Sequence, residues 1–223
     1  MKNSNIRTVV ALFVRVPVPG RVKSRLASSL GIDGACELYR AMVTDILSNI
    51  KECDFPVYLF HDDTNGCELP KEWTEASSMV IAQNGDSIGE RMASAFERCF
   101  AENVDQVVLI GSDIPGLDSR TVLAASLALE SHDAAVVPAV DGGYCLIALR
   151  RDTYQSTIFH DIPWSTDQVL RSTLEKCGER HLEVALLETL QDIDTIDDLR
   201  AYCRNPFNRA IATNSCLKVA GFL

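Results

Sequence analysis

Residues 107–116 constrain the fold of this chain more than any other stretch. Residues 107–110 are Val-Val-Leu-Ile, and such a short apolar run predicts a strand buried on both faces of a parallel sheet. The run stops abruptly at Gly111-Ser-Asp113, and Pro115-Gly116 adds a turn. Because ligands of open α/β sheets bind at the carboxyl ends of strands, Asp113 is a candidate ligand-binding carboxylate. The alternative is that Asp113 only caps its turn.

Strand patterns alternate with helical patterns over most of the chain, which predicts βαβ units and a mostly parallel sheet. We expect one domain over residues 1–223, with a core from about residue 8 to 204. The C-terminal tail, 205–223, is weakly patterned and is expected to form a short helix or a strand. The predicted strands are 8–16, 55–60, 79–82, 107–110, 134–140, 144–149 and 182–187, and the predicted helices are 33–50, 88–99, 120–130, 166–177 and 195–204.

The charge of the chain is unevenly distributed. The formal net charge is -10, and so acidic a surface argues against a nucleic-acid partner, because such partners require phosphates to be neutralised. Six of the 21 cations nevertheless precede the first acid, Asp33. This basic start is either a local anion site or a basic arm. Four of the six fall within positions 15–25, around a Pro-Gly turn, which favours the anion site.

The spacing of the cysteines and the lengths of the apolar runs indicate the cellular compartment of the protein. The eight cysteines are scattered without a Cys-x-x-Cys pair, which predicts free, buried thiols in a reducing compartment. No apolar run reaches about 18 residues, so no membrane span is expected. We therefore expect a cytoplasmic protein, and the sequence leaves its oligomeric state open.

The loop over residues 15–25 offers Arg15, Arg21, Lys23 and Arg25 around Gly20. Glycine lets backbone N–H groups approach an anion, and the cations neutralise phosphate charge. The loop is not a P-loop, because Lys23 lacks the preceding glycine at Walker spacing. It is therefore a candidate phosphate-binding loop, and the alternative is a solvated basic loop.

Several acidic residues could complete a metal site with Asp113. One carboxylate does not hold a divalent ion tightly, but it can do so jointly with substrate phosphates. Asp192 and Asp194 would point to the same side of an extended segment, so Asp194 is a candidate second ligand. A helix cap is the slightly favoured alternative for Asp194. Asp141, in the turn before Tyr144, could contact a hydroxyl or a metal, or simply belong to a hairpin.

Six motifs occur in an order that resembles the DUF2064 family, glycosyltransferase-like proteins of the nucleotide-diphospho-sugar transferase superfamily with a GT-A type fold. Each motif is weakly specific alone, whereas six in order form a specific match over nearly the whole chain. They lie at residues 17–26 (Pro-Val-Pro-Gly-Arg-Val-Lys-Ser-Arg-Leu), 89–92 (Gly-Glu-Arg-Met), 111–116 (Gly-Ser-Asp-Ile-Pro-Gly), 141–144 (Asp-Gly-Gly-Tyr), 163–166 (Pro-Trp-Ser-Thr) and 192–195 (Asp-Ile-Asp-Thr).

The resemblance implies a single-domain Rossmann-like α/β/α sandwich with a mostly parallel, mixed central sheet. It implies that Asp113 binds Mg²⁺ or Mn²⁺, and we add Asp194 as the second metal ligand. Catalytic roles are expected for Lys23, Arg25 and Asp113. The predicted nucleotide-binding residues are Arg15, Pro19, Gly20, Arg21, Lys23, Arg25, Gln83, Gly89 and Ser112. The predicted acceptor-binding residues are Asp141, Gly142, Gly143, Tyr144 and Trp164, the last of which could instead be a core residue.

One departure from the family pattern bears on the reaction. A glycosyltransferase Asp-x-Asp motif would need a second acid at position 111 or 115, where this chain has Gly111 and Pro115. The leading prediction is a metal-dependent transferase that moves a glycosyl group from a nucleotide-sugar to a small-molecule acceptor. One alternative is nucleotidyl transfer from a nucleoside triphosphate to a phosphorylated small molecule. Another is a non-catalytic, nucleotide-binding regulatory protein.

Overall fold

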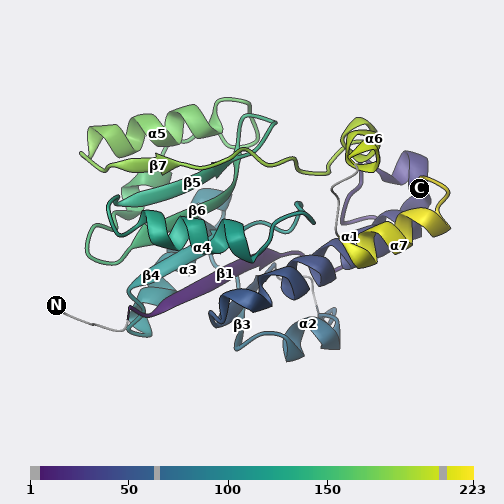
Figure 1. The fold of residues 1–223 in the computed structure, drawn as a ribbon, viewed down its shortest axis with the longest axis horizontal. Coiled ribbons are helices and arrows are strands. Elements are labelled where there is room, and N and C mark those ends of the chain that lie inside the picture. The colour runs from purple at the N-terminus through teal and green to yellow at the C-terminus, as the bar shows by residue number, and fades with distance from the viewer. Residues whose placement is uncertain (1–5, 63–65, 206–209) are drawn as a thin grey trace.

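A seven-stranded sheet forms the centre of the computed structural model, which describes residues 6–62, 66–205 and 210–223. The strand order is β3-β2-β1-β4-β6-β5-β7 (Figure 1). The strands are β1 Thr8–Val14, β2 Val57–His61, β3 Met79–Ala82, β4 Gln106–Ile110, β5 Ala134–Pro138, β6 Tyr144–Arg150 and β7 Val184–Leu186.

Among the strands of the described residues, one runs against the others. β6 is antiparallel to both β4 and β5, while β1, β2, β3 and β4 pair in parallel and β5 pairs in parallel with β7. The expected mostly parallel, mixed sheet is confirmed. The chain leaves β1 toward β2 and β3 and then returns to place β4 on the other side of β1. Such a reversal opens a crevice at the carboxyl ends of the two strands, where ligands of open α/β sheets bind.

Helices cover both faces of the sheet, which confirms the α/β/α sandwich. Buried side chains of α1 and α4 share one apolar cluster with residues such as Leu12 and Val108. Those of α3 and α5 share the opposite cluster with residues such as Ala11 and Val107. The helices are α1 Ala27–Asn49, η1 Ile50–Cys53, α2 Lys71–Glu75, α3 Ile88–Ala101, α4 Ser119–Ala128, η2 Ser156–Phe159, α5 Val169–Glu179, α6 Ile196–Arg204 and α7 Ile211–Val219.

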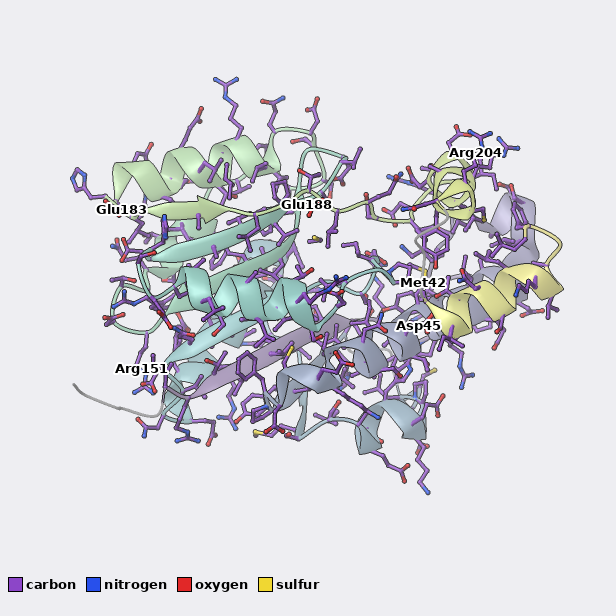
Figure 2. All side chains as sticks on the ribbon, in the orientation of Figure 1. Met42, Asp45, Arg151, Glu183, Glu188 and Arg204 are labelled. Atoms are coloured by element: carbon purple, nitrogen blue, oxygen red, sulfur yellow. The ribbon has the colours of Figure 1, made fainter. Side chains whose placement is uncertain are left out.

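A third apolar cluster joins the C-terminal helices to α1, and we call it the C-terminal cluster. Figure 2 labels Met42 and Asp45 on α1, where α7 lies alongside it. The buried Asp45 carboxylate accepts hydrogen bonds of 2.9 and 2.7 Å from the backbone N–H groups of Ala212 and Thr213. The tail is therefore helical over Ile211–Val219, while residues 206–209 lie outside the described part. The cluster contains Leu26, Ala35, Leu38, Met42, Ile193, Leu199, Tyr202, Ala210 and Leu217.

Element boundaries differ from the sequence-based expectation in places that local chemistry explains. Helix α1 runs from Ala27, but Gly31, with φ 75° and ψ 163°, breaks it after its first turn, so its long part begins beside Asp33, where the sequence predicts a helix start. Trp73 is fully buried in the short helix α2, which lies outside the predicted helices. Ser87 and Glu90 form a capping box at the start of α3, which agrees with the helix predicted over 88–99, and Asp118 caps α4.

The cysteines and helices can be compared with the expectations of free, buried thiols and of no membrane span. All eight cysteines are free thiols; five are buried, and Cys67 is exposed. Among the described residues, no helix combines the length and the apolar character needed to cross a bilayer.

Candidate functional site

The loop after β1 begins with a tight turn built by proline and glycine. The N–H of Arg21 donates to the carbonyl oxygen of Val18 over 3.0 Å, with Pro19 and Gly20 in the two central positions. Gly20 has φ +81°, which a type II turn requires at its second central position and which glycine adopts without strain. The turn leaves Arg15 and Arg21 exposed, and Arg25 is exposed further along the loop.

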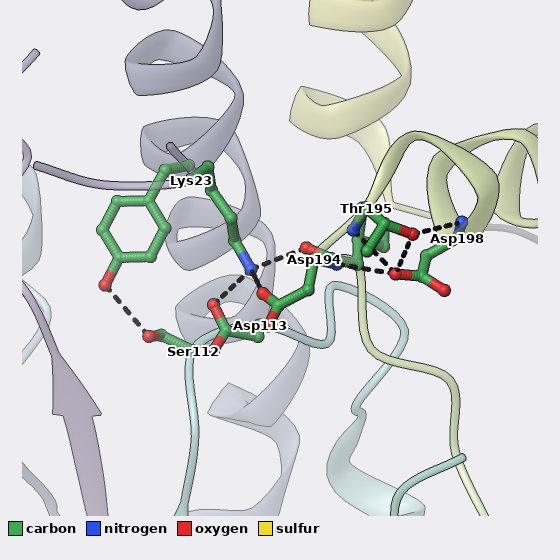
Figure 3. A network of polar contacts seen from close by, with 8 residues as sticks. Lys23, Ser112, Asp113, Asp194, Thr195 and Asp198 are labelled. Carbon is green, nitrogen blue, oxygen red and sulfur yellow. Dashed lines mark hydrogen bonds and ion pairs between the residues drawn. The ribbon is translucent and has the colours of Figure 1, made fainter. Parts of the chain in front are cut away.

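Lys23 lies in the same loop but is buried. Its side chain is 4% exposed, and its backbone has φ 48°, a left-handed conformation uncommon outside glycine. Its ammonium contacts Asp113 Oδ1 at 2.5 Å and Asp194 Oδ1 at 2.7 Å, and donates to the carbonyl oxygen of Ile193 at 2.6 Å (Figure 3). Asp113 and Asp194, the two predicted metal ligands, therefore both contact the ammonium of Lys23, a predicted nucleotide-binding residue.

The charges of this group stabilise one another. Burial opposes the charged form of Lys23, but the nearby Asp113 and Asp194 carboxylates outweigh it and raise the pKa of Lys23. Burial likewise opposes ionisation of Asp194, yet Lys23, and more weakly Arg25 and Arg15, hold the pKa of Asp194 below its ordinary value. By contrast, burial and then the neighbouring Asp141 raise the pKa of Asp192 to about 6. Asp194 is thus an ionised carboxylate that lies against the cationic loop of residues 15–25.

The position of Asp194 follows from the residues on either side of it. The N–H of Ile193 donates to the backbone oxygen of Asp113 over 3.0 Å, which joins this segment to the end of β4. The hydroxyl of Thr195, not the Asp194 carboxylate, caps α6, in a capping box with Asp198 (Figure 3). The cap alternative for Asp194 is therefore wrong, because Thr195 satisfies the helix terminus and leaves Asp194 free to face Lys23.

Two residues that sequence reasoning gave no role, Tyr39 and Asp62, support the site from behind. The buried Tyr39 hydroxyl accepts from the N–H of Arg15 at 2.8 Å and bonds the hydroxyl of Ser112 at 2.9 Å. Asp62 accepts from the N–H of Val16 at 2.7 Å. Asp62 follows β2, so its place after a strand was a usable signal. Tyr39 sits within the apolar pattern of a helix and gave none.

Two adjoining cavities open at the carboxyl ends of β1 and β4, and they share Arg15, Ser112 and Asp113. The loop-side cavity has a volume of about 550 Å³, and its further lining includes Arg21, Lys23, Arg25, Asp141, Thr166 and Asp194. The sheet-side cavity has a volume of about 420 Å³, and its further lining includes Phe13, Asp62, Gln83, Arg91, Leu109 and Tyr144. One cavity is therefore strongly charged, and the other is partly apolar.

The two predicted base contacts have different surroundings. Gln83 lines the sheet-side cavity, and its amide nitrogen donates to the carbonyl oxygen of Phe60 at 3.0 Å. Gly89 is buried, and a Cβ there would lie 2.7 Å from the oxygen of Phe159 and 2.8 Å from the indole of Trp164. Packing against these residues is thus sufficient reason for glycine at position 89. Trp164 packs against the apolar cluster of α3, as the core alternative predicts.

The turn between β5 and β6 contains the other predicted glycines. Asp141 accepts from the N–H of Gly143 at 2.8 Å, which folds the turn back on itself. Gly142 has φ +90°, and a Cβ there would lie 2.4 Å from the backbone oxygen of Asp167. Its own carbonyl oxygen accepts from the N–H of Leu170 at 2.9 Å. Gly142 is therefore required by a close approach of protein backbone.

Arg91 is a further cation that the sequence reasoning did not single out. It lines the sheet-side cavity, and its Nε donates to the carbonyl oxygen of Gly85 over 2.9 Å. It belongs to the Gly-Glu-Arg-Met motif, so the motif carried the signal. Arg91 places a positive charge beside the partly apolar cavity.

The fold is that of nucleotide-diphospho-sugar transferases. The crystal structure of a putative nucleotide-diphospho-sugar transferase from Desulfovibrio desulfuricans G20 matches with a TM-score of 0.89 and 34% identity, covering 97% of this chain and 96% of that one. Residues 47–166 match the model of the family described as uncharacterized proteins conserved in bacteria (DUF2064). The chain belongs to this family, which confirms the resemblance found in the sequence.

More distant structures share the fold alone. A cytidylyltransferase from Leptospira borgpetersenii has a TM-score of 0.55 and 12% identity, covering 97% of this chain and 94% of that one. A Mycobacterium tuberculosis H37Rv protein solved with manganese has a TM-score of 0.50 and 16% identity, covering 88% and 96%. These likenesses define an architecture and assign no reaction.

Proposed function

We propose that this protein is a divalent-metal-dependent transferase that binds a nucleotide or nucleotide-sugar across the two cavities and transfers a glycosyl group to a small-molecule acceptor. The observation that carries the proposal is the convergence of Asp113 and Asp194, from separate segments, on one cation. This convergence occurs beside the exposed Arg15, Arg21 and Arg25 of the loop-side cavity. Two comparisons agree with this proposal: the chain belongs to the DUF2064 family, and it is similar to a putative nucleotide-diphospho-sugar transferase.

The two carboxylates suit Mg²⁺ or Mn²⁺. The Lys23 ammonium already shows that both Oδ1 atoms can reach a single positive charge. Their side chains are 46% and 42% exposed, so each offers oxygen to the cavity. Within the described residues, no three His, Cys, Asp or Glu side chains gather as a metal-binding group. Magnesium is commonly held by one or two carboxylates together with substrate phosphates, and this donor set fits that pattern.

The proposed division of labour follows the chemistry of the lining. Arg15, Arg21 and Arg25 bind the phosphate oxygens through charge-assisted hydrogen bonds. The nucleoside occupies the sheet-side cavity, between its apolar wall and the polar groups of Gln83 and Arg91. Asp113 and Asp194 would hold the metal ion, which would supply positive charge to stabilise the leaving diphosphate. Catalysis is then mainly positioning and electrostatic stabilisation, as in related transfers of phosphate-bearing groups.

The acceptor is proposed to approach from the turn between β5 and β6. Asp141 is exposed there and lines the loop-side cavity together with the arginines. Its free carboxylate oxygen can orient an acceptor hydroxyl, while Oδ1 is held by the N–H of Gly143. Tyr144 shapes the adjoining cavity, whereas Gly142 and Trp164 act by packing.

Nucleotidyl transfer is the second candidate, and one observation favours it. The second carboxylate beside Asp113 comes from Asp194, on a distant segment, rather than from position 111 or 115. The Asp-x-Asp motif of glycosyltransferases is therefore missing at Gly111 and Pro115, whereas a carboxylate pair of this other origin could still hold metal and phosphates for nucleotidyl transfer.

Binding and product measurements test these proposals. We expect the protein to be stabilised by at least one of ATP, CTP, GTP, UTP or their common sugar derivatives, with Mn²⁺ or Mg²⁺ and not with EDTA. A ligand at a hundredfold its dissociation constant adds about 2.7 kcal/mol, which for a chain of this size raises Tm by about 5–10 °C. The absence of any metal-dependent shift contradicts the proposal.

The released product then separates the reactions. A nucleoside diphosphate set free from a sugar donor supports glycosyl transfer, and pyrophosphate set free from a triphosphate supports nucleotidyl transfer. Metal-dependent binding without either product, over a broad set of hydroxylated and phosphorylated acceptors, supports the regulatory alternative.

A further inference from the structure

We propose that Lys23 is an exchangeable counter-ion. Its ammonium holds Asp113 and Asp194 together before the ligand arrives, a divalent ion then replaces it between the two carboxylates, and the freed ammonium bonds the incoming phosphates. This inference rests on the metal role proposed above for the two carboxylates. It adds that Lys23 and the metal ion compete for one position.

The first argument is that the ammonium has no donor to spare. An ammonium has three N–H donors, and Lys23 has three oxygen acceptors: Asp113 Oδ1, Asp194 Oδ1 and the carbonyl oxygen of Ile193. The side chain is 4% exposed, so a phosphate in the cavity meets very little of it. Lys23 can therefore bond a phosphate only after it gives up at least one of these partners.

The second argument is electrostatic. Two ionised carboxylates that face one point repel each other unless a positive charge lies between them. Lys23 supplies one positive charge at that point, whereas Mg²⁺ or Mn²⁺ supplies two and also binds phosphate oxygens. Because Asp113 and Asp194 stay about half exposed, a metal ion can approach them from the cavity while Lys23 is still in place.

The third argument comes from the other cations of the loop. Arg15, Arg21 and Arg25 are exposed and line the cavity, so phosphates can be attracted before Lys23 moves. A lysine suits an exchange because its ammonium is compact and lies on a flexible four-carbon stem, whereas the planar guanidinium of arginine favours fixed, bidentate contacts. The loop thus combines three cations placed for capture with one placed for exchange.

The wild-type protein tests the exchange directly through lysine reactivity. The protein is treated briefly with an amine-acylating reagent across a Mn²⁺ titration without nucleotide, and the modified lysines are quantified by mass spectrometry. We expect Lys23 to be protected without metal and to become reactive as Mn²⁺ binds. Lys71, whose side chain is 86% exposed, should react equally throughout and serves as the internal reference. Unchanged protection of Lys23 at saturating Mn²⁺ overturns the inference.

A pair of variants tests the competition from the other side. Lys23→Met empties the position between the carboxylates, while Arg25→Met removes one charge from the same loop without touching that position. We expect Lys23→Met to bind Mn²⁺ alone at least about tenfold more tightly than the wild type, as measured by electron paramagnetic resonance, and Arg25→Met to gain less. Adding Asp113→Asn to Lys23→Met should abolish the gain.

The results distinguish this inference from the proposed function. The proposed metal role is wrong if two results occur together. Mn²⁺ fails to bind the wild type in the presence of each nucleotide tested, and it also fails to bind Lys23→Met. If Mn²⁺ and nucleotide bind the wild type together but Lys23→Met gains no affinity for Mn²⁺ alone, the metal role stands and the exchange is wrong. Should Lys23→Met fail to fold, the acylation of the wild type still decides the matter.

Discussion

Two glycine-containing turns border the loop-side cavity, and their glycines are there for different reasons. Gly20 and Gly142 both have a positive φ, +81° and +90°. A Cβ at Gly20 would meet only a methyl group of Ile32 at 3.7 Å, whereas one at Gly142 would lie 2.4 Å from the backbone oxygen of Asp167. Gly20 thus serves the shape of its turn, and Gly142 serves contact between two segments.

The comparison teaches that a glycine motif does not by itself identify a ligand-binding loop. In the first loop, the turn leaves Arg21 exposed, and the cavity continues to Arg25. In the second, the space that a ligand could use beside Gly142 is filled by protein. Of the second turn, Asp141 is the residue that reaches the loop-side cavity.

Alanine at the two glycines gives the largest expected difference in stability. Gly142→Ala combines the strain of a positive φ with a backbone clash, and we expect a loss of about 3–4 kcal/mol in the free energy of unfolding. Gly20→Ala carries the strain alone and should lose roughly 1–2 kcal/mol. Chemical denaturation of both variants measures the difference, and equal losses would show that the contact with Asp167 is unimportant.

Removing the carboxylate of Asp113 should have the next largest effect, and on ligand binding rather than on folding. Asp113→Asn keeps the side-chain shape but withdraws the charge that holds a metal ion. We expect the metal-dependent part of nucleotide stabilisation, about 2.7 kcal/mol at a hundredfold the dissociation constant, to disappear in thermal melts. Asp161→Asn, at an exposed loop position, is the matched control and should retain it. A full metal-dependent shift in Asp113→Asn would contradict the assignment.

A smaller effect is expected from the arginines of the first loop. Arg25→Gln removes one charge-assisted bond to phosphate, and nucleotide affinity should fall roughly tenfold, by calorimetric titration. Arg171→Gln, on α5 with a side chain 75% exposed, changes the net charge equally and should leave affinity unchanged. If both variants bind equally, Arg25 contributes only general electrostatic attraction.

The smallest expected effect concerns the segment that carries Asp194. Thr195→Ala removes the cap of α6 and should lower the free energy of unfolding by about 1 kcal/mol. The N–H of Asp194 donates to the Asp198 carboxylate, which the Thr195 hydroxyl also bonds. Loss of that hydroxyl should therefore loosen Asp194 and lower the affinity for the metal ion. Asp118→Ala removes the cap of α4 at a similar loss of stability, and its metal affinity should be preserved. Unchanged metal affinity in Thr195→Ala would separate the cap from the site.

The sequence predicted the architecture and much of the site, for local reasons. Periodicity identified strands such as Met79–Ala82 and the helix that begins at Ile88, because both depend on near neighbours. Spacing also indicated that Lys23, Asp113 and Asp194 matter. It did not show that they touch, because Lys23 and Asp194 are 171 positions apart and meet only through tertiary packing. For the same reason the packing partners of Gly89 and Gly142 were invisible.

Ile193 has a consequence for how the site and the C-terminal helices depend on each other. Its side chain is fully buried in the C-terminal cluster, its N–H bonds the backbone of Asp113, and its carbonyl oxygen accepts from Lys23. One peptide segment therefore ties the carboxylates to helices α6 and α7. Partial opening of these helices would carry Asp194 away while the sheet stayed folded, since proteins open in local cooperative units. Amide hydrogen exchange in α7 should therefore slow when a ligand binds beside Asp113 and Asp194.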